Sequence, residues 1–374
     1  MSVVVARPSI AKQWQDNTGS MIGVRSTAPV ETLLEIVSAA VKRGNATLPQ
    51  GYMFVDPWPT PQGVAFYVED ADTKDSILTL VEDIAASLDE AGVDARIGPL
   101  TNEPHPWPNR LHNDGFSAAM TIVGEPYWDA PGDPGGRRFT QRMWDADLGA
   151  RAQVIEHAVA WCEVDNGGLW LTADVSTFKI PREQAIALMM RIVETGTICS
   201  IVAARDAGLV RRVEFNHNGF AIFELGGTDR PDWQTCVEDL TSVLTDLHSL
   251  IEWGFVQSRP TSVSGIGPRT MRVVHNALWE PHKDEVPLLG YRQDPRRHTE
   301  FVLDVYGVQV LGPWHDVTAL AGDWEVRDLD HGRKLVSSRE PAAWFAEAPS
   351  LETLLTARGN FSSLVDPIWN PLEE

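Results

Sequence analysis

The stretch GVAFYVEDADTKDSILTLVEDIAASL, residues 63–88, decides the predicted fold because its pattern recurs later in the chain. Residues 219–244 read GFAIFELGGTDRPDWQTCVEDLTSVL. In both stretches, Val-Glu-Asp begins eighteen residues after a glycine that opens an apolar run. One shared tripeptide is weak evidence, so a true repeat requires the flanking sequence to match as well.

The segments upstream of the two stretches both have the features of a helix. Residues 29–44 (PVETLLEIVSAAVKRG) and 181–196 (PREQAIALMMRIVETG) each begin with proline and end with glycine. Proline is favoured in the first turn of a helix, and glycine commonly ends one. Spacings of three and four residues place apolar side chains on one face. The predicted buried stripes are Leu33, Val37, Ala40 and Val41 in the first helix, and Ile186, Met189, Met190 and Val193 in the second.

A further pair of amphipathic helices is predicted inside the repeated stretches. Their apolar stripes are Ile77, Val81, Ile84 and Leu88 in the first, and Trp233, Val237, Leu240, Leu244, Leu247 and Ile251 in the second. Acidic side chains lie opposite these stripes: Glu82, Asp83, Asp89 and Glu90, then Glu238, Asp239 and Asp246. Because the face opposite an apolar stripe points to solvent, these carboxylates are predicted to be solvated.

Between the helices the apolar residues alternate with a period of two, which indicates strands. The first copy has strand-like runs at 20–26, 52–55, 64–68 and 94–100, and the second has them at 169–178, 198–204, 209–215, 220–225 and 255–258. The order assigned to both copies is strand, helix, strand, strand, helix, strand, and the longer stretch between the helices of the second copy is taken as a wider hairpin. That order is a split βαβ unit, which resembles a ferredoxin-like layer of two helices on an antiparallel sheet. The alternative is two unrelated α+β segments with similar propensities.

The fold class is therefore predicted as α+β, with two tandem split βαβ repeats and a C-terminal α+β module. The predicted domains are a first repeat with an N-terminal arm (1–100), a linker with Pro/Trp-rich loops and a helix near 150–161 (101–165), a second repeat (166–258) and the C-terminal module (259–374). In the module we expect strands at 271–279 and 301–311, a hairpin at 324–338, and two short helices.

The composition limits the class of partner. The formal net charge of -21 repels phosphate backbones, so direct nucleic-acid binding is not expected, whereas a basic protein would be attracted. Plain solubility is the alternative reason for this charge. Three separated cysteines fit neither a disulfide framework nor a zinc site. With no membrane-length apolar stretch and no signal-peptide core, we expect a cytoplasmic protein that contacts no membrane.

Two loops contain the residues that could support chemistry. In PGDPGGRR (131–138), glycine amides with Arg137 and Arg138 could bind an anion, although an ordinary surface loop is the alternative. A P-loop is not predicted because its lysine and hydroxyl residue are missing. Arg110, His112 and Asp114 could do acid–base chemistry, but no nucleophile is identifiable beside them. No metal-ligand spacing and no cofactor motif is found.

Tryptophans on loops are candidate anchors for a partner, because each buries a large area with few rotatable bonds. They are Trp58, Trp107, Trp128 and Trp314, with core packing as the alternative for each. The acidic candidates for partner binding are Glu82, Asp83, Glu238 and Asp239.

Three classes of function follow from these patterns. The leading hypothesis is a non-enzymatic binding protein (an adaptor, an inhibitor or an immunity-type protein) that holds a protein partner with acidic helices and Trp-rich loops. An enzyme or small-ligand binder with a site between the two repeats is the second hypothesis. A structural subunit of a homo-oligomer or larger assembly is the third.

Overall fold

The protein is described from a computed structural model, in which two compact units form a mixed α+β fold with antiparallel sheets. The first unit is Met1–His105 with Gly168–Ser200, and the second is Pro106–Gly167 with Ile201–Glu374. The structure describes residues 2–16, 19–48, 53–69, 74–100, 115–128, 142–162, 169–173, 176–197, 199–204, 209–215, 219–227, 231–258, 302, 304–318, 320 and 322–365.

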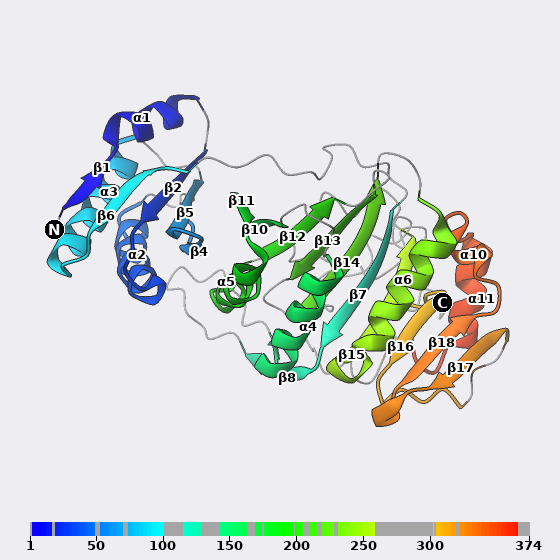
Figure 1. Ribbon diagram of the computed structural model, residues 1–374. Helices are drawn as coiled ribbons and strands as arrows, with labels where there is room; N and C mark the ends of the chain where they lie inside the picture. Colours follow the sequence, from blue (N-terminus) through cyan, green and yellow to red (C-terminus); the bar gives the residue numbers. More distant parts are fainter. Residues whose placement is uncertain are drawn as a thin grey trace. The chain divides into compact units, whose positions relative to one another are not determined.

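The first unit is built on a sheet with the order β1-β6-β2-β5-β3, in which β4 also pairs with β5 (Figure 1). Strand β1 runs parallel to β6, and the other described pairings are antiparallel. Its elements are β1 (Val3–Val5), α1 (Arg7–Asp16), β2 (Gly19–Arg25), α2 (Val30–Asn45), β3 (Met53–Phe54), β4 (Trp58–Thr60), β5 (Gly63–Glu69), α3 (Lys74–Glu90) and β6 (Ala95–Pro99).

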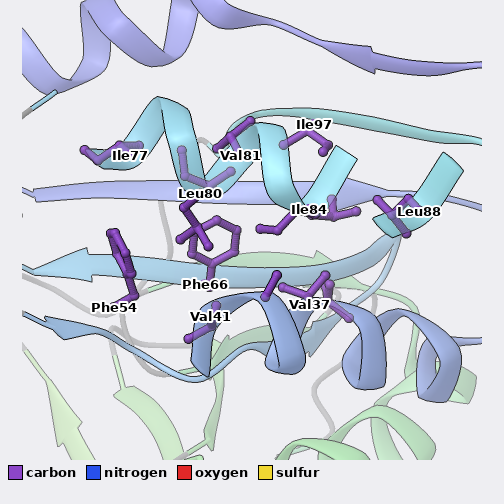
Figure 2. Close-up of a cluster of buried hydrophobic side chains, with 14 of the residues drawn as sticks. Val37, Val41, Phe54, Phe66, Ile77, Leu80, Val81, Ile84, Leu88 and Ile97 are labelled. Carbon is purple, nitrogen blue, oxygen red and sulfur yellow. The ribbon is translucent and has the colours of Figure 1, made fainter. Parts of the chain in front are cut away.

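The core of this unit forms where α2 and α3 cover the sheet. Figure 2 shows Phe66 of β5 between the side chains of the two helices. The predicted stripes of both helices are confirmed: Leu33, Val37, Ala40 and Val41 of α2 and Ile77, Val81, Ile84 and Leu88 of α3 are all buried. Each of the valine, leucine and isoleucine side chains contributes roughly 1.5–3 kcal/mol on burial, so the periodicity that predicts these helices also supplies much of their stability.

A hairpin and a helix from later in the chain complete the first unit. They are β10 (Leu169–Ala173), β11 (Ser176–Ile180) and α5 (Arg182–Glu194). The single strand predicted at 169–178 is therefore wrong, because Leu169–Ala173 and Ser176–Ile180 form two strands that pair antiparallel. The predicted stripe of α5 is also partly wrong. The buried side chains are Ala185, Leu188, Met189, Ile192 and Val193, so the buried face is rotated from the one that includes Ile186 and Met190.

The second large sheet has the order β11-β10-β12-β13-β14-β7-β15-β16-β18-β17. From β13 to β17 its strands belong to the second unit. The elements are β7 (Phe116–Ile122), α4 (Leu148–Trp161), β12 (Cys199–Ala204), β13 (Leu209–Phe215), β14 (Phe220–Gly227), α6 (Trp233–Asp246), η2 (His248–Leu250), β15 (Ile251–Ser258) and β16 (Val308–Leu311). Strands β8 (Gly124–Trp128) and β9 (Arg142–Ala146) form a separate two-stranded sheet.

Strand β7 lies in the middle of the second sheet, although residues 101–165 are predicted to be a linker. It pairs with β14 on one side and β15 on the other, and all seven of its residues are buried. A strand buried on both faces does not alternate between apolar and polar residues, so it lacks the signal by which half-buried strands are recognised. Residues 169–178, predicted as the opening strand of the second repeat, do not lie between β14 and β15. Strand β7 takes that place, and the helix that follows β7 in the chain is α4.

The helices of the second unit cover one face of its sheet. Figure 1 shows α6 along β7 and β15, and a Cβ placed on Gly254 would lie 2.8 Å from Cδ2 of Leu244. Helix α6 ends at Asp246, so Ile251, predicted on its stripe, belongs to β15 instead. Because strand side chains alternate between faces, Trp253 and Phe255 point to the face opposite α6.

The C-terminal residues extend the same sheet rather than forming a separate one. Strand β16 pairs with β15, and the predicted hairpin is confirmed as β17 (Trp324–Asp328), η5 (Asp330–Gly332) and β18 (Lys334–Ser338). The two predicted short helices are α10 (Ala342–Phe345) and α11 (Leu351–Asn360). The strand predicted at 271–279 lies outside the described residues.

Candidate functional site

Several predicted site residues fall outside the described part of the chain. These are Arg110, His112 and Asp114, the anion-site pair Arg137 and Arg138, and Trp107. Trp128 is the last residue of β8. The two candidate loops therefore remain sequence predictions.

The tryptophans with described side chains have opposite environments. Trp58 is fully buried, and its Nε1 donates a 2.9 Å hydrogen bond to Ser176 Oγ within the first unit. This residue is a core residue, so the prediction that it contacts a partner is wrong. Trp314 is 71% exposed, so it remains a candidate for contact with a partner.

The predicted acidic residues are used in different ways. Glu82 lies 3.2 Å from Arg7, and Asp83 lies 2.9 Å from Arg43, both in exposed ion pairs. Glu238 is exposed on α6. Asp239, by contrast, lies against the buried guanidinium of Arg211. The first three carboxylates are accessible to a partner, whereas Asp239 pairs with Arg211 inside the second unit.

Arg211 links β13 to α4 and α6 through contacts with one residue of each helix. Its guanidinium binds the Asp239 carboxylate and the Trp161 carbonyl, and it lies 4.4 Å from the centroid of the Trp161 ring. Trp161 Nε1 in turn donates to Asp239 at 3.2 Å. A buried cation requires such partners, because an uncompensated charge costs several kcal/mol in the interior. We interpret this cluster as structural.

The three cysteines are free and buried. Burial raises the pKa of the Cys162 thiol well above its ordinary value, although Arg211 opposes the shift. Burial also raises the pKa of Cys236 to about 11, with Asp239 and Asp232 adding to the effect. Because the thiolate is the nucleophilic form, neither thiol is suited to nucleophilic catalysis near neutral pH.

The face opposite α6 carries a row of polar side chains across neighbouring strands. Register pairs place Arg212 of β13 beside Glu224 of β14, then Ser117 of β7, then Gln257 of β15. Arg212 contacts Glu214 and lies 3.4 Å from Glu224. Gln257 Nε2 donates to Ser117 Oγ at 3.2 Å. We call this surface the polar face; its other members are Thr121, Trp253, Phe255 and Gln309.

Three residues of the polar face bury polar atoms that have no hydrogen-bond partner among the described residues. They are Thr121 Oγ1, Trp253 Nε1 and both polar atoms of the Gln309 amide. Each residue is at most 1% exposed, so bulk water does not reach these atoms. Leaving a buried polar group unpaired costs about 1–3 kcal/mol, and native proteins generally avoid this.

Aromatic rings lie beside these atoms. The ring centroids of Trp253 and Phe255 are 4.8 Å apart, and Tyr306 stacks on Phe255 at 3.7 Å with an interplanar angle of 13°. Thr121 lies directly across from Trp253, and Gln309 lies across from Phe255. The polar and aromatic groups thus occupy adjoining positions on one face.

A separate charged cluster lies at the end of β15. Burial raises the pKa of Glu252, and Arg333 partly offsets the shift. Arg333 Nε donates to the Ile251 carbonyl at 2.9 Å, and the Gly312 N–H donates to His315 Nδ1 at 3.0 Å. The Arg333 bond holds the residue after η5 against β15, and the His315 bond closes the turn after β16, so both roles are structural.

Within the described ranges, no three His, Cys, Asp or Glu side chains gather closely enough to hold a metal ion. None of the helices in that part of the chain combines the length and apolar character needed to cross a membrane. No protein-family model matches the chain, and no curated protein is similar to it in sequence.

Sequence reasoning missed the polar face. Ser117 and Thr121 lie in the segment assigned to a linker, and Gln309 is a single polar residue in an apolar strand. The feature of the sequence that could have indicated this surface is the glutamine inside the strand-like run 301–311. A polar side chain there faces a neighbouring strand, but only the strand order shows which one.

Proposed function

We propose that this chain is a non-enzymatic binding protein that holds a basic protein partner on the outer surface of α3. The observation that carries the proposal is the line of Asp75, Glu82 and Asp89, three exposed carboxylates spaced seven residues apart on one helix. Two turns of helix are close to seven residues, so the three side chains lie along one line. We call this line the acidic stripe.

The acidic stripe is available for a partner. Asp75 and Asp89 have no ion-pair partner within the described residues. Glu82 pairs with Arg7, but both side chains are more than half exposed. Exposed pairs of this kind contribute about 0–1 kcal/mol, so an arginine or lysine of a partner can replace Arg7 at small cost. The net charge of -21 would also raise the rate of encounter with a basic protein.

Photo-crosslinking tests this proposal. A benzoylphenylalanine at the exposed position Thr79, on the same helix, should form an adduct with a protein in native extract. The variant D75N/E82Q/D89N should lose the adduct. The control E340Q/E347Q/E352Q removes three exposed carboxylates from the second unit and should keep it. An adduct that survives neutralisation of the stripe, or no adduct at all, contradicts the proposal.

We also propose that the chain contains two split βαβ, ferredoxin-like units. The first connects β2, α2, β3, β5, α3 and β6, and its strand order β6-β2-β5-β3 supports the proposal. The second would connect β7, α4, β13, β14, α6 and β15, with the strand order β15-β7-β14-β13. Residues 169–204 would then be an insertion between α4 and β13. Matching order of connection supports a duplication with this altered boundary.

The proposed setting is the cytoplasm. Three free, buried cysteines are typical of proteins kept in a reducing compartment. A protein partner and no directly bound nucleic acid follow from the same negative charge that supports the acidic stripe.

A further inference from the structure

Strand β17 is an exposed edge of the second sheet. Among the described strands it pairs only with β18, and Figure 1 shows it at the outer end of the sheet. The residues from Glu325 to Asp328 are all exposed, including Val326 at 42%. Because successive side chains of a strand point to opposite faces, both faces of β17 are open to solvent here. An edge of this kind presents backbone N–H and C=O groups that can pair with another strand.

The edge is held in an extended conformation by the rest of the unit. The pairing of β17 with β18 is regular from Trp324 opposite Ser338 to Asp328 opposite Lys334. The ring of Trp324 also packs against Trp344 and Phe361, with centroid distances of 5.8 Å and 4.9 Å. A second strand would therefore meet a preorganised edge and would lose little conformational entropy from β17 itself on binding.

The hydrogen bonds of the hairpin show which backbone groups of β17 point outward. The Leu329 N–H donates to the Arg333 carbonyl, and the Arg339 N–H donates to the Asp323 carbonyl. Residues that are hydrogen-bonded to the partner strand alternate along an antiparallel pair, so the residues between 323 and 329 that face β18 are 325 and 327. Val326 and Asp328 therefore direct their N–H and C=O groups away from the sheet.

The charges of β17 are complementary to a second copy of the same strand. In an antiparallel pair with a two-fold axis at Val326, Glu325 of each copy lies opposite Arg327 of the other. Glu325 and Arg327 have no ion-pair partner within the described ranges, so both are available for this contact. An axis at Glu325 or at Arg327 would instead place two like charges directly opposite each other, which is destabilising.

We propose that β17 pairs with β17 of a second copy of this chain about a two-fold axis at Val326, which extends the sheet across a homodimer. The Val326 N–H of each copy then donates to the Val326 carbonyl of the other, and the Asp328 N–H donates to the Trp324 carbonyl. This pairing satisfies the outward groups and selects one register by charge. It uses the second unit and not the acidic stripe, so either proposal can fail alone.

The dimer is expected to be weak. A contact between two strands of this length is smaller than the roughly 1,200 Å² buried in stable complexes. The net charge of -21 on each copy also opposes association. We expect a Kd on the order of 10–100 μM at physiological ionic strength, so the protein should be monomeric when dilute and dimeric when concentrated.

Sedimentation equilibrium of the full-length protein tests for the dimer. Between about 1 and about 500 μM, the mass should rise from one chain toward two. In hydrogen exchange over the same range, the outward amide of Val326 should exchange more slowly as the concentration rises. The amide of Arg327, which already faces β18, should change much less.

Charge-reversal variants test the register. Glu325→Arg and Arg327→Glu each place like charges opposite each other at both contacts and should each weaken the dimer by about tenfold or more. Mixed in equal amounts, the two variants should form a heterodimer, because one then has two positive positions and the other two negative ones. The control Glu347→Arg makes the same change of net charge at an exposed position outside β17 and should not weaken the dimer.

Val326→Pro tests the backbone contact without altering charge. Proline removes an N–H that points away from β18, so the hairpin should remain folded by circular dichroism while the dimer is lost. If a charge variant does not fold, this variant decides the result, and a dimer that survives it refutes the proposal. A single-chain mass at every concentration also overturns the proposal. So does a dimer that neither charge reversal weakens, or a mixture of the two variants that stays monomeric.

Discussion

At the scale of single residues, the buried arginines show how an acidic chain uses part of its negative charge internally. Arg211 lies against Asp239, and Arg358 lies against Asp304. The Arg358 Nε to Asp304 Oδ1 distance is 2.8 Å, and both side chains are only 1% exposed. Such pairs are required once the charges are buried, because the cost of an isolated ion in the interior exceeds the gain from packing.

Asp304→Asn should lower the free energy of unfolding by about 3–5 kcal/mol, because it removes the carboxylate charge that faces the buried Arg358 guanidinium. Urea denaturation measures the loss. The double variant Asp304→Leu with Arg358→Met should recover much of it, since apolar groups of similar volume often replace a buried pair without loss. The exposed pair Lys334–Asp328 is the control, where Asp328→Asn should cost about 0–1 kcal/mol. A loss equal to the control would refute a buried ion pair.

At the scale of elements, helix α6 has a defined start. The Asp232 side chain accepts hydrogen bonds from the Thr235 N–H at 2.9 Å and from Thr235 Oγ1 at 2.7 Å. These bonds hold the pKa of Asp232 below its ordinary value. The stability of the start of α6 therefore depends on whether the Asp232 side chain is ionised.

Because the folded-state pKa of Asp232 is lowered, its contribution to stability is present above the ordinary pKa of about 3.9 and is lost as pH falls through the folded value. Asp232→Ala should therefore lower Tm at pH 7, and the difference from the wild type should shrink below about pH 4. Asp232→Asn keeps an N-cap side chain and should lose most of the pH dependence. A Tm difference that stays constant down to pH 2 would show that the charge is not involved.

Strand β7 is the element whose role depends most on its neighbours. It is buried along its whole length and is paired on both sides. In native-state hydrogen exchange, its amides should exchange only by global unfolding. Strand β17, at the end of the sheet order and largely exposed, should exchange far earlier. Rapid exchange throughout 116–122 would contradict the central position of β7.

At the scale of the whole molecule, one hydrophobic cluster of the first unit is built from buried residues within 10–97. This cluster includes no residue of the hairpin and helix that join the unit later in the chain. The fragment 1–100 should therefore fold by itself and melt cooperatively when followed by circular dichroism. Trp58 would lose Ser176, so its fluorescence should shift to longer wavelength. A random-coil spectrum would show that β10, β11 and α5 are needed for folding.

Local periodicity predicts much of this fold. The buried stripes of α2 and α3 match the expected residues, and β13 spans the predicted range 209–215. The candidate site is different, because its members lie on strands β7, β15 and β16, far apart in sequence. No spacing rule connects Thr121, Trp253 and Gln309, since their proximity arises from strand pairing.

The amino-acid order alone thus determined where helices form and which of their faces are apolar, because a helix closes its hydrogen bonds within four residues and its stripe can be read from nearby positions. Tertiary structure alone decided that β7 lies between β14 and β15, and therefore which polar side chains share a buried face. A strand has no partner within its own segment, so its neighbours are chosen by the pairing and burial of the whole sheet.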